Sequence, residues 1–70
     1  MSNSRTYRIG SPTLALVREG NLQVARTVPR GSIVAAIDSL NIDRLIKVTW
    51  DGKQVMMFAQ NIRSRGQRIS

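Results

Sequence analysis

Apolar and polar residues alternate in short runs along most of the chain, a pattern that indicates β-strands rather than long helices. Turn-forming residues interrupt these runs at short spacing: Gly10-Ser11-Pro12, Gly20-Asn21, Pro29-Arg30-Gly31, Asn41–Asp43, Asp51-Gly52 and Gly66. Short strands separated by frequent turns are typical of a small sandwich or barrel. The pattern predicts an all-β domain, with strands expected at Thr6–Ile9, Thr13–Val17, Leu22–Val28, Arg44–Trp50, Lys53–Phe58 and Gln67–Ile69.

The dipeptide Asp51-Gly52 gives the most detailed prediction. Asp-Gly between two β-forming runs favours a two-residue type I′ turn, in which both central residues have positive φ. Such a turn pairs Trp50 with Lys53, and side chains then alternate between the two faces of the sheet. One face therefore collects four apolar residues and is expected to face the core: Ile46, Val48, Val55 and Met57.

The opposite face of this hairpin is half apolar, because Leu45, Met56 and Phe58 lie between polar residues. A sheet with one face in water normally keeps that face polar, so a cover is expected. The segment Ala59–Arg65 resembles a short helical turn, with Phe58 and Ile62 on one side, and is expected to supply part of the cover. A second copy of the chain is expected to supply the rest, which predicts an oligomer interface at Leu45, Met56 and Phe58.

Three other segments lead to less specific expectations. Arg18–Asn21 is expected to form a four-residue hairpin loop, and Val28–Gly31 fits a type I turn. The segment Ser32–Leu40 fits either a helix with Ser32 as its N-cap or a strand. Its β-branched content favours a strand, in which the residues expected to face inward are Ile33, Ala35 and Ile37.

The order of these segments resembles that of SH3-like barrels. The stretch Val48–Ile62 carries the resemblance, and Pro29–Val34 gives it weaker support. The chain is also similar to small bacterial proteins of the kind found in genomes and mobile gene cassettes. The resemblance implies a small barrel of about five to six short strands with one short C-terminal helical turn. It implies an architecture and carries no function of its own.

Length and composition bound the number and kind of domains. The 70 residues are expected to form a disordered N-terminus at 1–4 and a single SH3-like domain at 5–70. Domains this small are marginally stable without disulfides, metals or oligomerisation. The chain has no Cys and no His, so a homo-oligomer is the favoured expectation. No signal peptide and no apolar run near the ~20 residues of a membrane-spanning helix is present, so a cytoplasmic location is expected.

Eleven Lys and Arg against four Asp and Glu give a formal charge of +7. This charge predicts attraction to polyanions such as nucleic acid, or to an acidic protein. The residues expected to bind an anion or nucleic acid are the clustered Arg63, Arg65 and Arg68, together with Lys47. Trp50 could stack on a base, although capping one end of the core is the favoured role.

No catalytic, metal-binding or cofactor-binding motif is found. General acid–base catalysis usually needs a His or a carboxylate with a shifted pKa. The four acidic residues have evident turn or surface roles: Glu19, Asp38, Asp43 and Asp51. The sequence thus favours a non-enzymatic binding or structural module that mediates protein interaction. Nucleic-acid binding is the alternative, and a small enzyme with a site built at a subunit interface is the third hypothesis.

Overall fold

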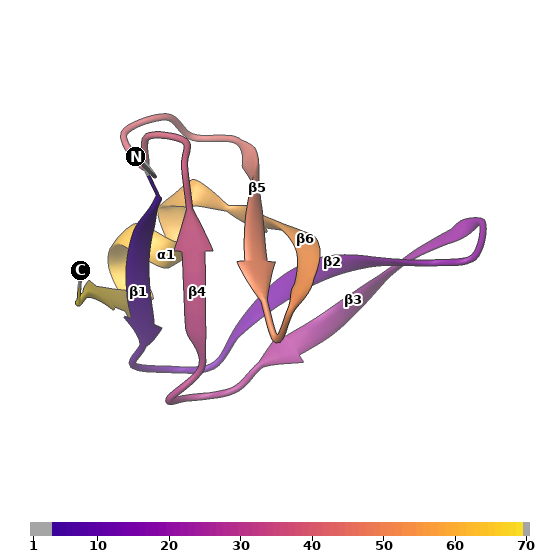
Figure 1. Cartoon of the computed structure of the whole chain (residues 1–70), viewed down its shortest axis with the longest axis horizontal. Coiled ribbons are helices and arrows are strands. Elements are labelled where there is room, and N and C mark those ends of the chain that lie inside the picture. The colour runs from indigo at the N-terminus through magenta and orange to yellow at the C-terminus, as the bar shows by residue number, and fades with distance from the viewer. Residues whose placement is uncertain (1–3, 70) are drawn as a thin grey trace.

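The computed structural model of the chain describes residues 4–69 as one curled, antiparallel sheet, a half-barrel of seven strands with one short helix (Figure 1). The sheet order is β3-β2-β6-β5-β4-β1-β7. The strands are β1 (Arg5–Ile9), β2 (Thr13–Glu19), β3 (Leu22–Val28), β4 (Ile33–Ala36), β5 (Leu45–Trp50), β6 (Lys53–Phe58) and β7 (Gly66–Arg68), and the helix is α1 (Ala59–Arg65).

This architecture confirms the predicted all-β class, with seven strands where about five to six were expected. The short strands expected at both ends of the chain form and pair with each other, Ile9 with Gly66 and Tyr7 with Arg68. The disorder expected at 1–4 falls mostly outside the described residues. Within residues 4–69, no helix has the length and hydropathy that a membrane crossing needs.

The β5–β6 hairpin forms in the predicted register, from Trp50 opposite Lys53 to Leu45 opposite Phe58. Asp51 has φ 54° and Gly52 has φ 72°, which confirms the type I′ turn. The predicted inner face is confirmed as well. Its four apolar side chains are buried in the core: Ile46, Val48, Val55 and Met57.

The core fills the concave side of the sheet. Tyr7 and Ile9 of β1, Ala15 of β2 and Val28 of β3 meet the hairpin's inner face there, and Ile62 of α1 is fully buried with them. Strands β1, β4, β5 and β6 each contribute two alternate residues, because successive side chains point to opposite faces, whereas β7 contributes none. The core is therefore assembled mainly from these four strands and α1.

Helix α1 has the predicted bounds, but it does not cover the outer face of the hairpin. Its buried residues are Ala59 and Ile62, which belong to the core, while Phe58 is 50% exposed. The chain passes directly into β7 at Gly66, which is extended (φ −108°) rather than left-handed. A Cβ at Gly66 would lie 2.7 Å from the carbonyl oxygen of Ile62, so close packing explains the glycine.

The segment Ser32–Leu40 contains a strand, as expected, but a shorter one with the opposite orientation. Val34 and Ala36 are buried, whereas Ile33 and Ile37 are exposed. The cause is the pairing of Val34 with Trp50 and of Ala36 with Val48, which lie on the inner side of β5. The inward facing expected for Ile33, Ala35 and Ile37 is wrong, because neighbouring strands decide the faces of a strand this apolar.

The β2–β3 hairpin also differs from expectation. Its loop has two residues, Gly20-Asn21, instead of four, and Glu19 pairs with Leu22. Gly20 has φ 62° whereas Asn21 does not have a positive φ, which is the pattern of a type II′ turn. The longer strands carry this hairpin well beyond the body of the half-barrel, as Figure 1 shows.

The turn at Asp51-Gly52 can be tested alone. Gly52→Val should lower the free energy of unfolding by about 1–3 kcal/mol, because valine is strained at positive φ. No atom lies within 4 Å of a Cβ built at Gly52, so the loss measures backbone strain rather than a clash. Asp51→Asn is the control, since asparagine tolerates this conformation. Urea denaturation of both variants checks the prediction, and an unchanged Gly52→Val protein would contradict the turn.

Candidate functional site

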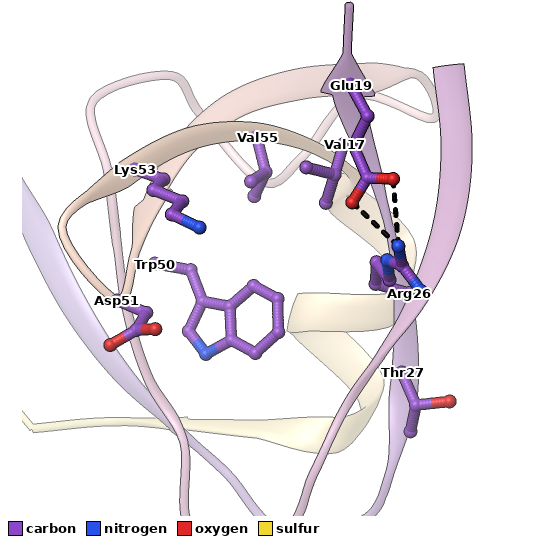
Figure 2. Close-up of a pocket in the computed structure, with 8 residues that line it drawn as sticks. All are labelled: Val17, Glu19, Arg26, Thr27, Trp50, Asp51, Lys53 and Val55. Carbon is purple, nitrogen blue, oxygen red and sulfur yellow. Dashed lines mark hydrogen bonds and ion pairs between the residues drawn. The ribbon is translucent and has the colours of Figure 1, made fainter. Parts of the chain in front are cut away.

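One end of the half-barrel opens into a hollow of about 240 Å³ around the indole of Trp50. Val17 and Val55 form its apolar wall, and Trp50 is half-buried against the core. Figure 2 shows charged residues on two sides: Glu19 and Arg26 from the β2–β3 hairpin, and Asp51 and Lys53 from the β5–β6 turn.

The charges around the opening of this hollow, which we call its mouth, balance one another. Arg26 donates from Nη2 to both carboxylate oxygens of Glu19, at 2.8 and 2.7 Å. Both side chains are about half exposed, and exposed ion pairs contribute only about 0–1 kcal/mol. With Asp51 and Lys53 opposite, the rim carries as many acidic as basic groups. The mouth therefore attracts neither anions nor cations strongly, which favours a core-capping role for Trp50.

A second surface lies on the convex side of the sheet. Leu16 of β2 pairs with Met56 of β6, and Leu45 of β5 pairs with Phe58 of β6. Alternation along each strand places Leu14 on the same face as Leu16, and Phe58 on the same face as Met56. We call this set the outer apolar patch: Leu14, Leu16, Leu45, Met56 and Phe58. Leu14 is 54% exposed, and Leu16, Leu45 and Met56 are half-buried.

Basic residues border this patch. Arg18 and Lys47, both exposed, line a hollow of about 210 Å³ together with Leu16 and Met56. Alternation along β2, β3, β5 and β6 places no acidic side chain on the outer face of these strands. Glu19 faces the mouth, and the other acidic residues are in turns and loops. The outer face is thus apolar and basic.

A third surface gathers arginines from both ends of the chain. Arg5, Arg63 and Arg68 line a hollow of about 370 Å³ with Tyr7 and residues 39–41. Arg63 holds the 37–44 loop, since it donates to the carbonyl oxygen of Leu40 and, at 3.2 Å, to Asp43. We call this cavity, with the Arg5, Arg63 and Arg68 that line it, the arginine hollow.

The structure separates the four residues expected to bind anions. Arg63 and Arg68 share the arginine hollow, whereas Arg65 points to the β1–β2 connection. There it donates to the carbonyl oxygen of Pro12 at 3.2 Å and to Ser11 Oγ at 3.5 Å. Lys47 lies on the outer face. The residues expected at an oligomer interface, in contrast, lie together: Leu45, Met56 and Phe58.

Sequence reasoning missed Leu14, Leu16, Arg18 and Arg5 as surface residues of these sites. A signal existed for the two leucines, because Leu14–Val17 is apolar at every position, as in a strand covered on both faces. Arg5 gave no signal, since only the pairing of β1 with β7 brings it near Arg68. Comparison with known protein families, curated proteins and solved structures gives no match to the chain.

The role of Trp50 can be decided by truncation. If the indole caps the core, Trp50→Ala should lower the free energy of unfolding by about 2–3 kcal/mol, less than the ~3–5 of a fully buried tryptophan. Lys53→Ala, on the facing strand, should change it by less than about 1 kcal/mol. Urea titrations followed by circular dichroism measure both values. Full stability of Trp50→Ala would instead leave the indole available as a stacking surface.

Proposed function

We propose that the chain is a small SH3-like barrel that acts as a non-enzymatic protein-interaction module. The strand order supports the SH3-like assignment: around the sheet run β7, β1, β4, β5 and β6, with α1 preceding β7 and the β2–β3 hairpin inserted after β1. A tight hairpin followed by one helical turn and a last short strand is similar to the order of SH3-like barrels. The fold alone carries no function, so the proposal rests on the surface.

The single observation that carries the proposal is the outer apolar patch. Five apolar side chains from β2, β6 and β5 lie on the convex face of the sheet, where Leu16 pairs with Met56 and Leu45 with Phe58, and Leu14 and Phe58 are at least half exposed. Large contiguous apolar patches rimmed by polar residues are typical of protein-binding surfaces. Met56 adds an unbranched, adaptable side chain at the centre of the patch.

The rim of the patch specifies the chemistry of the partner. Arg18 and Lys47 are its charged neighbours, and no acidic residue shares the outer faces of β2, β3, β5 and β6. Two copies placed face to face would bring like charges together, which costs binding free energy. A partner with apolar side chains flanked by Asp or Glu complements both properties. We therefore assign the patch to an acidic, amphipathic segment of another protein.

A titration followed by NMR tests this assignment. The probe is a short amphipathic peptide with leucine and phenylalanine on one helical face and glutamate on the other. We expect amide shifts to concentrate at Leu14, Leu16 and Met56. In the double variant Leu14→Ser, Phe58→Ser the affinity should fall at least tenfold, which corresponds to about 1.4 kcal/mol.

Two controls make the result specific. The same peptide with lysine in place of glutamate should bind far more weakly, because it meets Arg18 and Lys47 with like charge. Leu22→Ser removes an apolar side chain that is 69% exposed at the tip of the β2–β3 hairpin, away from the patch, and should bind like the wild type. Equal binding of both peptides, or shifts centred elsewhere, would contradict the proposal.

Nucleic-acid binding is a second candidate, and the arginine hollow favours it. Its three guanidinium-bearing residues line one hollow beside Tyr7, where Arg63 forms an ion pair with Asp43. Guanidinium groups bind phosphate well because two of their N–H groups can donate hydrogen bonds to two phosphate oxygens at once. A phosphate backbone could therefore follow this side of the molecule without touching the outer apolar patch.

Salt dependence tests the second candidate. The double variant Arg5→Ser, Arg68→Ser should bind a single-stranded oligonucleotide more weakly. The slope of log K against log salt should become shallower by about 0.7 for each phosphate that the variant no longer neutralises. Arg18→Ser, Lys47→Ser removes the same charge from the outer face and is the matched control. If both double variants weaken binding equally, net charge alone causes the attraction and the hollow has no special role.

A further inference from the structure

We propose that two copies of the chain pair edge to edge through β3, in antiparallel register about a two-fold axis at Ala25. This inference goes beyond the protein-interaction function, since it uses the free edge of the sheet and leaves the outer apolar patch exposed. Its occupant is a second copy of this chain.

The edge of β3 is open and its free groups can be assigned. Among the described residues β3 pairs with β2 alone, so its other side has no neighbouring strand. The two-residue turn makes Glu19 and Leu22 a hydrogen-bonded pair, and in an antiparallel ladder such pairs alternate with non-hydrogen-bonded ones. The register continues without a bulge to Thr13 opposite Val28. The backbone N–H and C=O groups that point away from β2 therefore belong to Gln23, Ala25 and Thr27.

The strand lacks most of the devices that normally protect an exposed edge, and its one protecting feature is the charged Arg26, which faces the concave side with Ala15. Natural edge strands are kept short, bent by bulges or interrupted by proline and lysine, and a long flat edge invites pairing with another strand. β3 has seven residues, no proline, no bulge and no lysine. Its Leu22 end projects with β2 beyond the half-barrel, where a second strand can approach it, whereas its Val28 end lies against the body of the molecule (Figure 1).

The sequence of β3 is complementary to itself in one register. A two-fold axis at Ala25 pairs Ala25 with its counterpart and Gln23 with Thr27 of the second copy, each exchanging both backbone hydrogen bonds. It also sets Leu22 opposite Val28, which engages all seven residues of the strand. A two-fold axis at any other residue of β3 leaves part of the strand unpaired, so the axis at Ala25 pairs the largest number of residues.

The charge distribution permits this pairing despite the +7 of each chain. Arg26 is the one charged residue of β3, and its own Glu19 neutralises it at 2.7 Å. In the proposed register Arg26 lies opposite Val24 of the second copy, so no like charges face each other directly.

Pairing at Ala25 would extend one continuous sheet across both copies. The side chain of Ala25 is on the outer face beside Leu16, so the two outer apolar patches would lie on the same surface of the joined sheet. If the proposed protein-interaction function also holds, the dimer would present two binding patches side by side. The pairing itself does not depend on that function.

Molar mass measured by light scattering and sedimentation equilibrium tests the proposal. The wild type should be a dimer at high micromolar concentration in physiological salt, at which the Debye length is about 8 Å. Ala25→Glu should be a monomer, because it sets two carboxylates opposite each other on the axis, whereas the matched Ala25→Gln should remain a dimer. Circular dichroism and thermal unfolding establish that both variants fold. The double variant Leu14→Ser, Phe58→Ser, which should lose the glutamate-rich peptide, keeps β3 unchanged and should remain a dimer, which separates this test from that of the outer patch.

Disulfide formation tests the register itself, because the chain contains no cysteine. Residues directly opposite in a hydrogen-bonded pair have Cα atoms about 5.5 Å apart, within the range a disulfide spans. Ala25→Cys should therefore form a covalent dimer rapidly under mild oxidation. Thr27→Cys, also exposed on the same face of the same strand, lies opposite Gln23 and should cross-link at least tenfold more slowly. A monomeric wild type, a dimer that Ala25→Glu leaves intact, or equal cross-linking of the two cysteine variants would overturn the proposal.

Discussion

The type I′ turn at Asp51-Gly52 decides which side chains of this small domain meet water. Positive φ at both residues sets Trp50 opposite Lys53, and the alternation of β5 and β6 then follows for their whole length. A register shifted by one residue would exchange the two faces of a strand. Val55 and Met57 would leave the core, and Met56 and Phe58 would enter it. Because β2 pairs with β6 at Met56 and β4 pairs with β5 at Trp50, the same turn also determines the faces of two further strands.

A sheet that is apolar on both faces follows from this arrangement. The inner face of the sheet encloses the core. Leu14, Leu16 and Phe58 remain outside, because α1 packs Ile62 into the core instead of covering them. A domain of this size has few residues with which to build a second cover. We propose that the surface left exposed in this way binds a partner, for which the basic rim of Arg18 and Lys47 would favour an acidic one. Because the chain is this short, the edge of β3 is also left without a neighbouring strand among the described residues.

Local chemistry was sufficient to predict part of this structure. Asp51-Gly52 has one favoured geometry, so the register of β5 and β6 and the burial of Val48 and Met57 could be derived from neighbouring residues. The faces of β4 could not, because Ile33–Ile37 is apolar throughout and only its pairing with Trp50 selects Val34 for the core. The arginine hollow could not be predicted from the sequence either. Arg63 and Arg65 are close in sequence, yet their side chains point to different parts of the molecule. Arg5 comes near Arg68 only because β1 and β7, at the two ends of the chain, pair in the sheet.

The most direct test of the account is the measurement by NMR of nuclear Overhauser effects between Hα protons across β5 and β6. The turn makes Trp50 and Lys53 a hydrogen-bonded pair, so Lys47 and Met56 form a non-hydrogen-bonded pair, in which Cα atoms approach to about 4.5 Å. We expect strong Hα–Hα effects between Lys47 and Met56 and between Thr49 and Gln54. Effects that instead link Lys47 to Val55 or Met57 would show a shifted register, place Met56 on the inner face and contradict the outer apolar patch.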